Sequence, residues 1–287
     1  MRDTSNYKIL KLLQDHRGLD FLGHRDTMVQ RRIAKRLLAV KCNSEEDYLS
    51  YLNENPTEMD HLIDVLTINV SEFFRNPLTF EYLFSQIIHQ IVEKKSIEKG
   101  SSIRVWSAGC ARGEEAYSLA IQFEDYMQKE NLHLETRVFA TDIDPKAIQN
   151  AKEGIYKDHS ILNLKYHQMD KYFLKYEDGF HLKDKIKKNV HFSFHDLLST
   201  SQLAPPESIY GGFDLILCRN VLIYFDMNYQ KKIFEKLYRN LKPNGYLVLG
   251  DTEVLHKDYK DDFRRLNNCC KVFQKRLSSN LNIKKSI

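Results

Sequence analysis

Apolar residues in the first part of the chain recur at the spacing of one helical face. One such run consists of Met59, Leu62, Ile63 and Leu66. Asn55-Pro56 precedes this run, and an N-cap residue followed by proline is typical of a helix start. Ser44, with Asp47 three positions later, is typical of a capping box that opens another helix. The pattern predicts a helical domain over residues 1–76.

From Asn76-Pro77, which opens a further helix, short apolar runs begin to alternate with helical segments. The runs cover residues 103–106, 138–140, 213–218 and 246–249. Such alternation is typical of parallel strands joined by crossover helices, so we expect an α/β fold with a doubly wound sheet over residues 77–287. A predicted hairpin, 172–176 with 180–183, breaks this rhythm and indicates a small antiparallel insertion at about 168–192.

Composition adds constraints on the kind of protein. The 287 residues, 42% of them hydrophobic, are enough for a core and for more than one domain. We expect a cytoplasmic monomer without membrane insertion, because no apolar run is long enough to span a bilayer and the start has no signal-peptide core. Five cysteines without C-x-x-C spacing predict reduced thiols and no structural zinc. A net charge of +4 does not by itself indicate nucleic-acid binding, and the polar last ten residues predict disorder.

The run 103–106 leads into a loop with Gly109 and Gly113, and then into a helix that starts with Glu114 and Glu115. Glycines at the carboxyl edge of a sheet let the backbone approach a ligand, which makes Gly109 a candidate binding residue. The spacing is not G-x-G-x-x-G, and two acids at a helix start would repel a pyrophosphate but suit a cation such as the sulfonium of S-adenosylmethionine. Alternatively, the acids only complement the helix dipole, worth up to about 1 kcal/mol each.

Further polar residues follow other strands at the same edge. Asp142 ends the second run, where an acid can accept hydrogen bonds from ribose hydroxyls. Asp144-Pro145 is better explained as a helix start. Arg219 and Asn220 come directly after the run 213–218, where open α/β sheets bind ligands.

Four motifs together resemble the CheR family of chemotaxis receptor glutamate methyltransferases. They are Thr67-Ile68-Asn69-Val70-Ser71-Glu72-Phe73-Phe74-Arg75, Trp106 to Ser118, Ala140 to Asp144 and Cys218 to Asp226. The resemblance implies a class I S-adenosylmethionine-dependent methyltransferase domain behind a helical domain, with a small β-subdomain. It implies methyl transfer to glutamate carboxylates in the cytoplasmic helices of methyl-accepting receptors, with S-adenosylhomocysteine as the second product.

Carried over by position, the resemblance also implies site residues. The implied cofactor contacts are Asn69, Ser71, Arg75, Glu115, Asp142, Asp196, Leu197, Arg219 and Asn220. Arg75 and Tyr224 are placed near the methyl-transfer centre, although a tyrosine at such a corner also fits a packing role. The chain departs from the family pattern at Ser71 for threonine, at Asp196 for asparagine, and at Arg112 and Ala116 beside the glutamates.

Other features leave alternatives open. A basic helical face at Arg31, Arg32, Lys35 and Arg36 fits either receptor docking or a solvated surface. The basic hairpin could add a receptor tail as a further strand. His191 and His195 lack a third metal ligand and are interpreted as structural. A nucleic-acid methyltransferase and a non-catalytic binding module are the rival functions; the missing N/D-P-P-Y/F and Pro-Cys motifs argue against the first, and retention of the site residues against the second.

Overall fold

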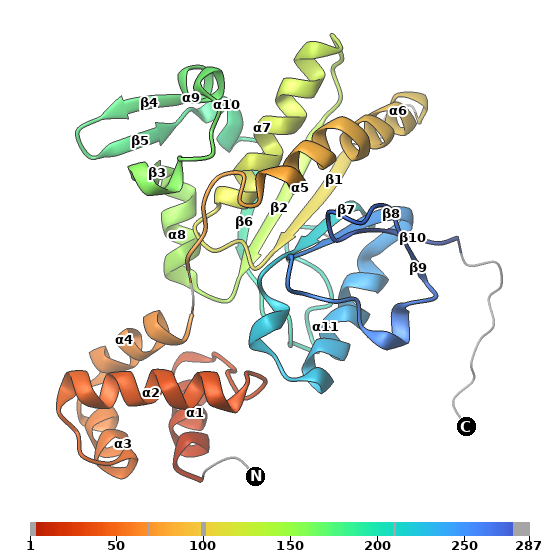
Figure 1. Cartoon of the computed structure of the whole chain (residues 1–287). Coiled ribbons are helices and arrows are strands. Elements are labelled where there is room, and N and C mark those ends of the chain that lie inside the picture. Colours follow the sequence, from red (N-terminus) through yellow and green to blue (C-terminus); the bar gives the residue numbers. More distant parts are fainter. Residues whose placement is uncertain (1–3, 68, 99–101, 209–210, 278–287) are drawn as a thin grey trace.

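The computed structural model describes residues 4–67, 69–98, 102–208 and 211–277. Ile68 of the first motif and the predicted disordered end, 278–287, lie outside them. Figure 1 shows a helical bundle below a large twisted sheet, and a small second sheet beside the sheet's upper edge. Within the described residues, no helix has the length and apolar character needed to cross a membrane.

The helical bundle contains the helices that the apolar spacing predicts. It consists of α1 (Thr4–Arg17), α2 (Asp26–Val40), α3 (Glu45–Glu54) and α4 (Pro56–Leu66). Both predicted starts are confirmed: Ser44 Oγ accepts a hydrogen bond from the Asp47 amide at 3.1 Å, and Pro56 occupies the first turn of α4. The apolar face of α4 packs into a core of its own with Ile33 and Leu52.

The large sheet has the order β6-β2-β1-β7-β8-β10-β9. Its parallel strands are β1 (Ile103–Ala108), β2 (Thr136–Asp142), β6 (Val190–Phe194), β7 (Phe213–Cys218) and β8 (Leu241–Leu249). An antiparallel pair, β9 (Phe263–Arg265) and β10 (Val272–Lys275), continues it from β8. The predicted doubly wound α/β fold is therefore confirmed, with an antiparallel edge that the sequence did not reveal.

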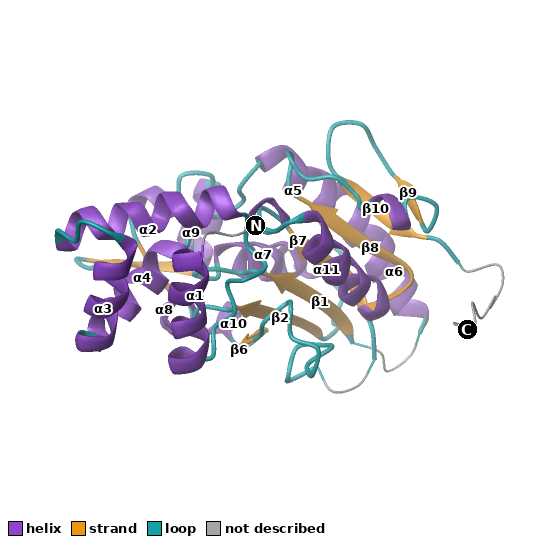
Figure 2. Cartoon of the chain, turned by 90° about the horizontal axis from the view of Figure 1, so that it is seen from below, coloured by secondary structure: helices purple, strands orange, loops and turns teal. Residues whose placement is uncertain are grey.

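Helices cover both faces of this sheet (Figure 2). One face carries α5 (Pro77–Tyr82), the π-helix η1 (Leu83–Ile88), α6 (His89–Ile97), α7 (Glu114–Lys129) and α8 (Pro145–Glu153); the other carries α11 (Met227–Asn240). Alternate residues of β1 face opposite sides, so Val105 packs in the cluster under α7 and Trp106 in the cluster under α11. Both layers leave the carboxyl ends of the parallel strands uncovered.

The small sheet has the order β3-β5-β4, from β3 (Ile155–Tyr156), β5 (Gly179–Leu182) and β4 (Phe173–Tyr176). It confirms the predicted hairpin and adds β3, which is too short to show a period of its own. The helices α9 (Tyr166–Tyr172) and α10 (Asp184–Lys187) flank the hairpin. Residues from Val190 onward, at the end of the predicted insertion, pair instead with β2 of the large sheet.

Candidate cofactor and methyl-transfer site

Two adjoining cavities, of about 720 and 440 Å³, lie at the carboxyl ends of the parallel strands. The larger is lined by Asn69, Asp142, Asp196 and Leu197, and the smaller by Ser71, Arg75, Glu115 and Arg219. Gly109, Asn220 and Tyr224 line both. The structure thus gathers every predicted site residue around two cavities that share part of their lining and that we together call the hollow.

The loop after β1 is shaped by its glycines. Gly109 has a φ of +77° and Gly113 a φ of +89°, a region of backbone conformation that favours glycine. A Cβ at position 109 would lie 2.4 Å from Val221 Cγ2, so the loop has no room for a side chain there. The amide of Gly109 also donates to the carbonyl of Thr141 at 2.8 Å, which holds the loop against β2.

Asp142, at the tip of β2, is oriented by the backbone. Its Oδ2 accepts from the Ala111 amide at 2.8 Å and its Oδ1 from the Asp144 amide at 3.0 Å. Each oxygen keeps a further lone pair, which fits the predicted role toward ribose hydroxyls. Burial raises the pKa of Asp142. Asp144 instead caps α8 through the amides of Lys146 and Ala147, as predicted.

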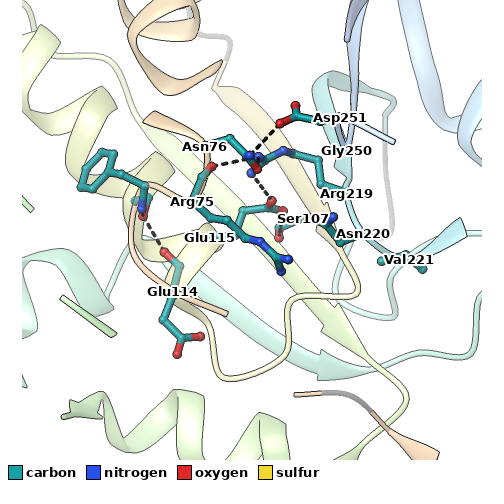
Figure 3. A network of polar contacts seen from close by, with 12 residues as sticks. Arg75, Asn76, Ser107, Glu114, Glu115, Arg219, Asn220, Val221, Gly250 and Asp251 are labelled. Atoms are coloured by element: carbon teal, nitrogen blue, oxygen red, sulfur yellow. Dashed lines mark hydrogen bonds and ion pairs between the residues drawn. The ribbon is translucent and has the colours of Figure 1, made fainter. Parts of the chain in front are cut away.

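The two acids at the start of α7 have opposite surroundings (Figure 3). Glu115 lines the smaller cavity, where it accepts from Ser107 Oγ at 2.8 Å and pairs with Arg219 at 3.1 Å. Glu114 points away and is only 1% exposed, and its Oε2 has no hydrogen-bond partner among the described residues. Burial raises the pKa of Glu114 to about 7. Only Glu115 can therefore complement a cationic ligand.

Arg219 connects this acid to the segment that carries Arg75. Its guanidinium donates to the Arg75 carbonyl at 2.8 Å and to Asn76 Oδ1 at 2.7 Å (Figure 3). Asn76 in turn donates to Asp251 at 2.6 Å. Because Arg219 is buried and pairs with Glu115, its charge serves to hold this part of the site rigid.

Arg75 and Tyr224 both line the smaller cavity. Arg75 donates to the Val70 carbonyl at 3.2 Å and is partly exposed. Burial raises the pKa of the Tyr224 hydroxyl, while the positive charges of Arg75 and Arg32 oppose this shift. The hydroxyl therefore stays protonated near pH 7 and can donate a hydrogen bond.

The turn at Asn220, which has a φ of +59°, depends on a residue that sequence analysis missed. Glu253, buried after β8, accepts hydrogen bonds from four amides. These are the amides of Asn220 (3.0 Å), Val221 (2.9 Å), Leu222 (2.7 Å) and Gly250 (2.6 Å). An acid just beyond the end of a strand was the only available signal.

The helical domain also reaches the site, which the sequence did not predict. Phe21 and His24 line the larger cavity together with Asp20. His24 forms an antiparallel bridge with Phe225, and the Arg25 amide donates to the Tyr224 carbonyl at 2.8 Å. The segment between α1 and α2 is thereby fixed to η3 (Leu222–Tyr224), the short helix that ends in Tyr224.

Of the four basic residues predicted on one face of α2, two are exposed and two bond to groups of α4. Arg31 and Lys35 are exposed. Arg36 instead pairs with buried Glu58, through hydrogen bonds of 2.8 and 2.7 Å, and Arg32 donates to the Val65 carbonyl. The four basic residues therefore do not all face solvent, because Arg32 and Arg36 bond to groups of α4.

The histidines singled out from the sequence pack against aromatic rings. His195 is buried with its ring edge toward Trp106, and His191 stacks on Phe139. Among the described residues, no group of three or more histidine, cysteine or acidic side chains could hold a metal ion. Their structural interpretation remains in agreement with these contacts.

The fold and this hollow define a class of enzyme. A doubly wound sheet, a glycine loop after β1 and an acid at the tip of β2 are the features that bind a nucleoside in open α/β folds. Glu115 lines the smaller cavity at the start of α7, where it would complement the cation of S-adenosylmethionine and repel a pyrophosphate, so the residues present fit this cofactor. The protein is a class I S-adenosylmethionine-dependent methyltransferase.

Sequence comparison gives the family. Residues 69–271 match the CheR methyltransferase, SAM binding domain, and residues 7–67 match the CheR methyltransferase, all-alpha domain. The chain belongs to the CheR methyltransferase family. The predicted family, enzyme class, cofactor and fold class are confirmed.

Named relatives are similar to this chain along most of their length. The chemotaxis protein methyltransferase of Borreliella burgdorferi is 30% identical over 251 residues, covering 86% of this chain and 87% of that protein. The chemotaxis protein methyltransferase of Salmonella typhimurium is 32% identical over 259 residues, covering 88% and 84%. A solved structure, the N-methyltransferase NodS from Bradyrhizobium japonicum, is 16% identical and covers 71% of this chain and 100% of that one, with a TM-score of 0.37.

Proposed function

We propose that this protein transfers the methyl group of S-adenosylmethionine to glutamate side chains of methyl-accepting chemotaxis receptors, forming methyl esters and S-adenosylhomocysteine. Family membership supports this activity. The structural observation that carries it is the arrangement of Arg75, Glu115 and Tyr224 around the smaller cavity, which shares part of its lining with the larger cavity at Asp142.

We assign the two ends of the cofactor from the two cavities. The adenosine end would be held by Asn69, Gly109, Asp142, Asp196 and Leu197, and the methionine end by Ser71, Arg75, Glu115, Arg219 and Asn220. When bound, the cofactor supplies a methyl group on a positively charged sulfur. The acid Glu115 lies on the side where that charge and the ammonium group would be neutralised.

The chain itself needs to supply orientation rather than a base. A glutamate has an ordinary pKa of about 4.3 and is already an anion near pH 7. Arg75 can hold a carboxylate through paired hydrogen bonds, and the protonated Tyr224 hydroxyl can donate a third. Positioning of the reacting atoms then lowers the barrier.

The finer partner assignments also belong to this proposal. The exposed Arg31 and Lys35 at the surface of α2 fit the glutamate-rich helices of a receptor. In the small sheet, β4 pairs on one side with β5 and lies at the edge of the order β3-β5-β4, where a receptor tail could add as a strand. We further infer a cytoplasmic monomer that binds no nucleic acid. The division of the chain at residue 76 likewise remains a prediction.

Arg75→Ala tests the proposed function. The measurement is transfer of labelled methyl from S-adenosylmethionine to a receptor cytoplasmic fragment, with base-labile release as the sign of an ester. We expect at least a hundredfold loss of rate in Arg75→Ala, because a charge-assisted hydrogen bond to the reacting groups is lost. Arg137→Ala, on an exposed arginine that pairs with Glu135, is the matched control and should retain full activity.

Two results would count against this proposal. Full activity of Arg75→Ala with an unchanged melting temperature would remove Arg75 from the mechanism. Failure of the unmodified protein to place any base-labile label on the receptor fragment, while it still binds the cofactor, would exclude glutamate as the acceptor.

A further inference from the structure

Lys236, on α11, is a buried lysine that lies beneath the larger cavity. Its Nζ donates to the carbonyl of Asp196 at 3.1 Å and to the carbonyl of Ser199 at 2.8 Å. The residue is only 4% exposed, and both of these bonds go to main-chain carbonyls rather than to a carboxylate. Taking an ammonium out of water is costly, so this placement calls for an explanation.

The two carbonyls belong to one tight turn after β6. The Ser199 amide donates to the Asp196 carbonyl at 3.1 Å, and Asp196 Oδ1 accepts from the Leu198 amide at 2.8 Å. Asp196 and Leu197, at the start of this turn, line the larger cavity. Lys236 therefore contacts both ends of a turn whose first two residues face the cavity.

The strand order shows which part of the cofactor this turn would meet. Strands lie in the order β6-β2-β1-β7, with Glu115 and Arg219 on the β1 and β7 side and Asp142 at β2. A ligand whose charged end lies at Glu115 and whose ribose lies at Asp142 extends its base toward β6. The turn at Asp196 is then the adenine end, an assignment that rests on the proposed function.

We propose that Lys236 is a positioning residue for the adenine end of S-adenosylmethionine, holding the turn Asp196–Ser199 so that Asp196 and Leu197 face the base. The alternative is that Lys236 only stabilises the fold. Replacing Lys236 by an apolar side chain leaves the Ser199 carbonyl without this donor, which costs stability under either role. Lys236→Met still separates the two roles at a temperature where the variant is folded, because positioning predicts weaker binding by the folded variant and a purely structural role predicts unchanged affinity.

The charge state of Lys236 provides a second readout. Burial lowers the pKa of Lys236 to about 8, and the nearby carboxylate of Asp196 partly opposes this. The other titratable group that faces Lys236 is His195. Burial lowers the pKa of His195 to about 4, so its imidazole is uncharged throughout the pH range of the experiment. Lys236 is charged below pH 8 and loses its proton above it, so its bonds to the two carbonyls weaken as the pH rises.

The experiment is a titration of the full chain with S-adenosylmethionine by calorimetry between pH 6.5 and 9.5. We expect Lys236→Met to bind about tenfold more weakly than the unmodified protein at pH 7, and the ratio to shrink above pH 8. Taking the ratio at each pH removes the titration of the ligand's own amino group. At saturating cofactor the kcat should be unchanged, because the change acts on KM.

Asn240→Ala is the matched control. Asn240 lies one turn further along α11 and donates to the Leu203 carbonyl of the same loop at 2.7 Å, away from the cavity. It should bind the cofactor as tightly as the unmodified protein. Equal affinity of Lys236→Met at pH 7, or a ratio that stays constant through pH 8, would overturn the inference. Asp142→Ala, measured in parallel, tests the cofactor site on which the inference rests. If Asp142→Ala also binds S-adenosylmethionine normally, the proposed cofactor site is wrong, and not only the role of Lys236.

Discussion

The cofactor hollow and the helix α2 are two regions with conspicuous polar residues in the sequence, and the structure treats them differently. Around the hollow, residues as far apart in the chain as Asn69 and Tyr224 converge on one place. On α2, four neighbouring basic residues separate, with Arg31 and Lys35 outward and the other two bonded within the bundle.

The difference teaches where sequence reasoning has a physical basis. Residues at the carboxyl ends of parallel strands must meet at one edge, because the sheet's hydrogen bonding sets their positions. The exposure of a side chain on an amphipathic helix depends on what its neighbours offer. Arg36 turns inward because it bonds to Glu58 on α4, which also accepts a hydrogen bond from Tyr48 on α3. The spacing of residues within α2 does not reveal this partner.

The largest expected effect tests the inward half of α2. Arg36→Ala leaves Glu58 buried without its cation, and breaking such a pair costs about 4 kcal/mol. Although burial raises the pKa of Glu58, bonds from Arg36 and Tyr48 outweigh it and lower the pKa. This stability is fully present above the ordinary pKa of 4.5 and is lost as the pH falls through the lowered value. Urea unfolding at pH 7 measures the loss, and Arg31→Ala should change it by less than about 0.5 kcal/mol.

If Arg36→Ala and Arg31→Ala are equally mild, the distinction between the two halves of α2 is wrong. Equally severe losses of stability from both variants would also contradict the distinction, because the exposed Arg31 is expected to contribute little to stability.

A second prediction sharpens the comparison beside the hollow, between Glu115, which lines it, and the adjacent Glu114, which points away from it. With a pKa of about 7 in the folded protein, Glu114 keeps a proton that the unfolded chain releases near pH 4.5. The free energy of unfolding should therefore fall, by about 3 kcal/mol from this group, as the pH rises from 4.5 to 7. Glu114→Gln should flatten that slope, measured by urea unfolding across this range.

Glu93→Gln, on an exposed side chain of α6, is the control for that measurement and should leave the slope in place. A slope that persists unchanged in Glu114→Gln would mean that Glu114 is ionised in the folded protein and has a partner of its own.

The smallest expected effect concerns the outward half of α2. Reversing both exposed charges, Arg31→Glu with Lys35→Glu, should slow receptor methylation about threefold at low salt and less at 0.5 M salt, because exposed charges act over a screened distance. Methyl-transfer rates at several receptor concentrations give the change in KM. Identical kinetics at all salt concentrations would exclude docking through this surface.

Much of the fold followed from the sequence, and the exceptions have physical causes. The N-cap at Ser44 and the strand over 213–218 lie where local pattern predicts them, because each is determined by its own residues. The strands β3 and β9 have two and three residues, too few for a period, and form only through pairing with partners. Their existence is decided by tertiary contacts.

The site shows the same division. Every residue predicted for the site lines one of the two cavities, but motif residues such as Thr67, Ile143 and Phe225 line them too and were not identified. Glu253 and Lys236 were also missed. Both act from outside the cavities, one by accepting amides and the other by donating to carbonyls of loops that line them. A charged residue that bonds to the main chain has no recognisable sequence motif, because every residue has a main-chain amide or carbonyl and no particular partner residue is required.

The bridge between His24 and Phe225 affects how the chain could be recombined. Gly23 leaves no space for a side chain, because a Cβ there would lie 2.5 Å from Leu198 and 2.8 Å from Tyr229. The helical region therefore cannot be exchanged between relatives independently of the catalytic region. A chimera that takes its first seventy residues from a relative should work only if the complementary surface around residue 225 is transplanted with them.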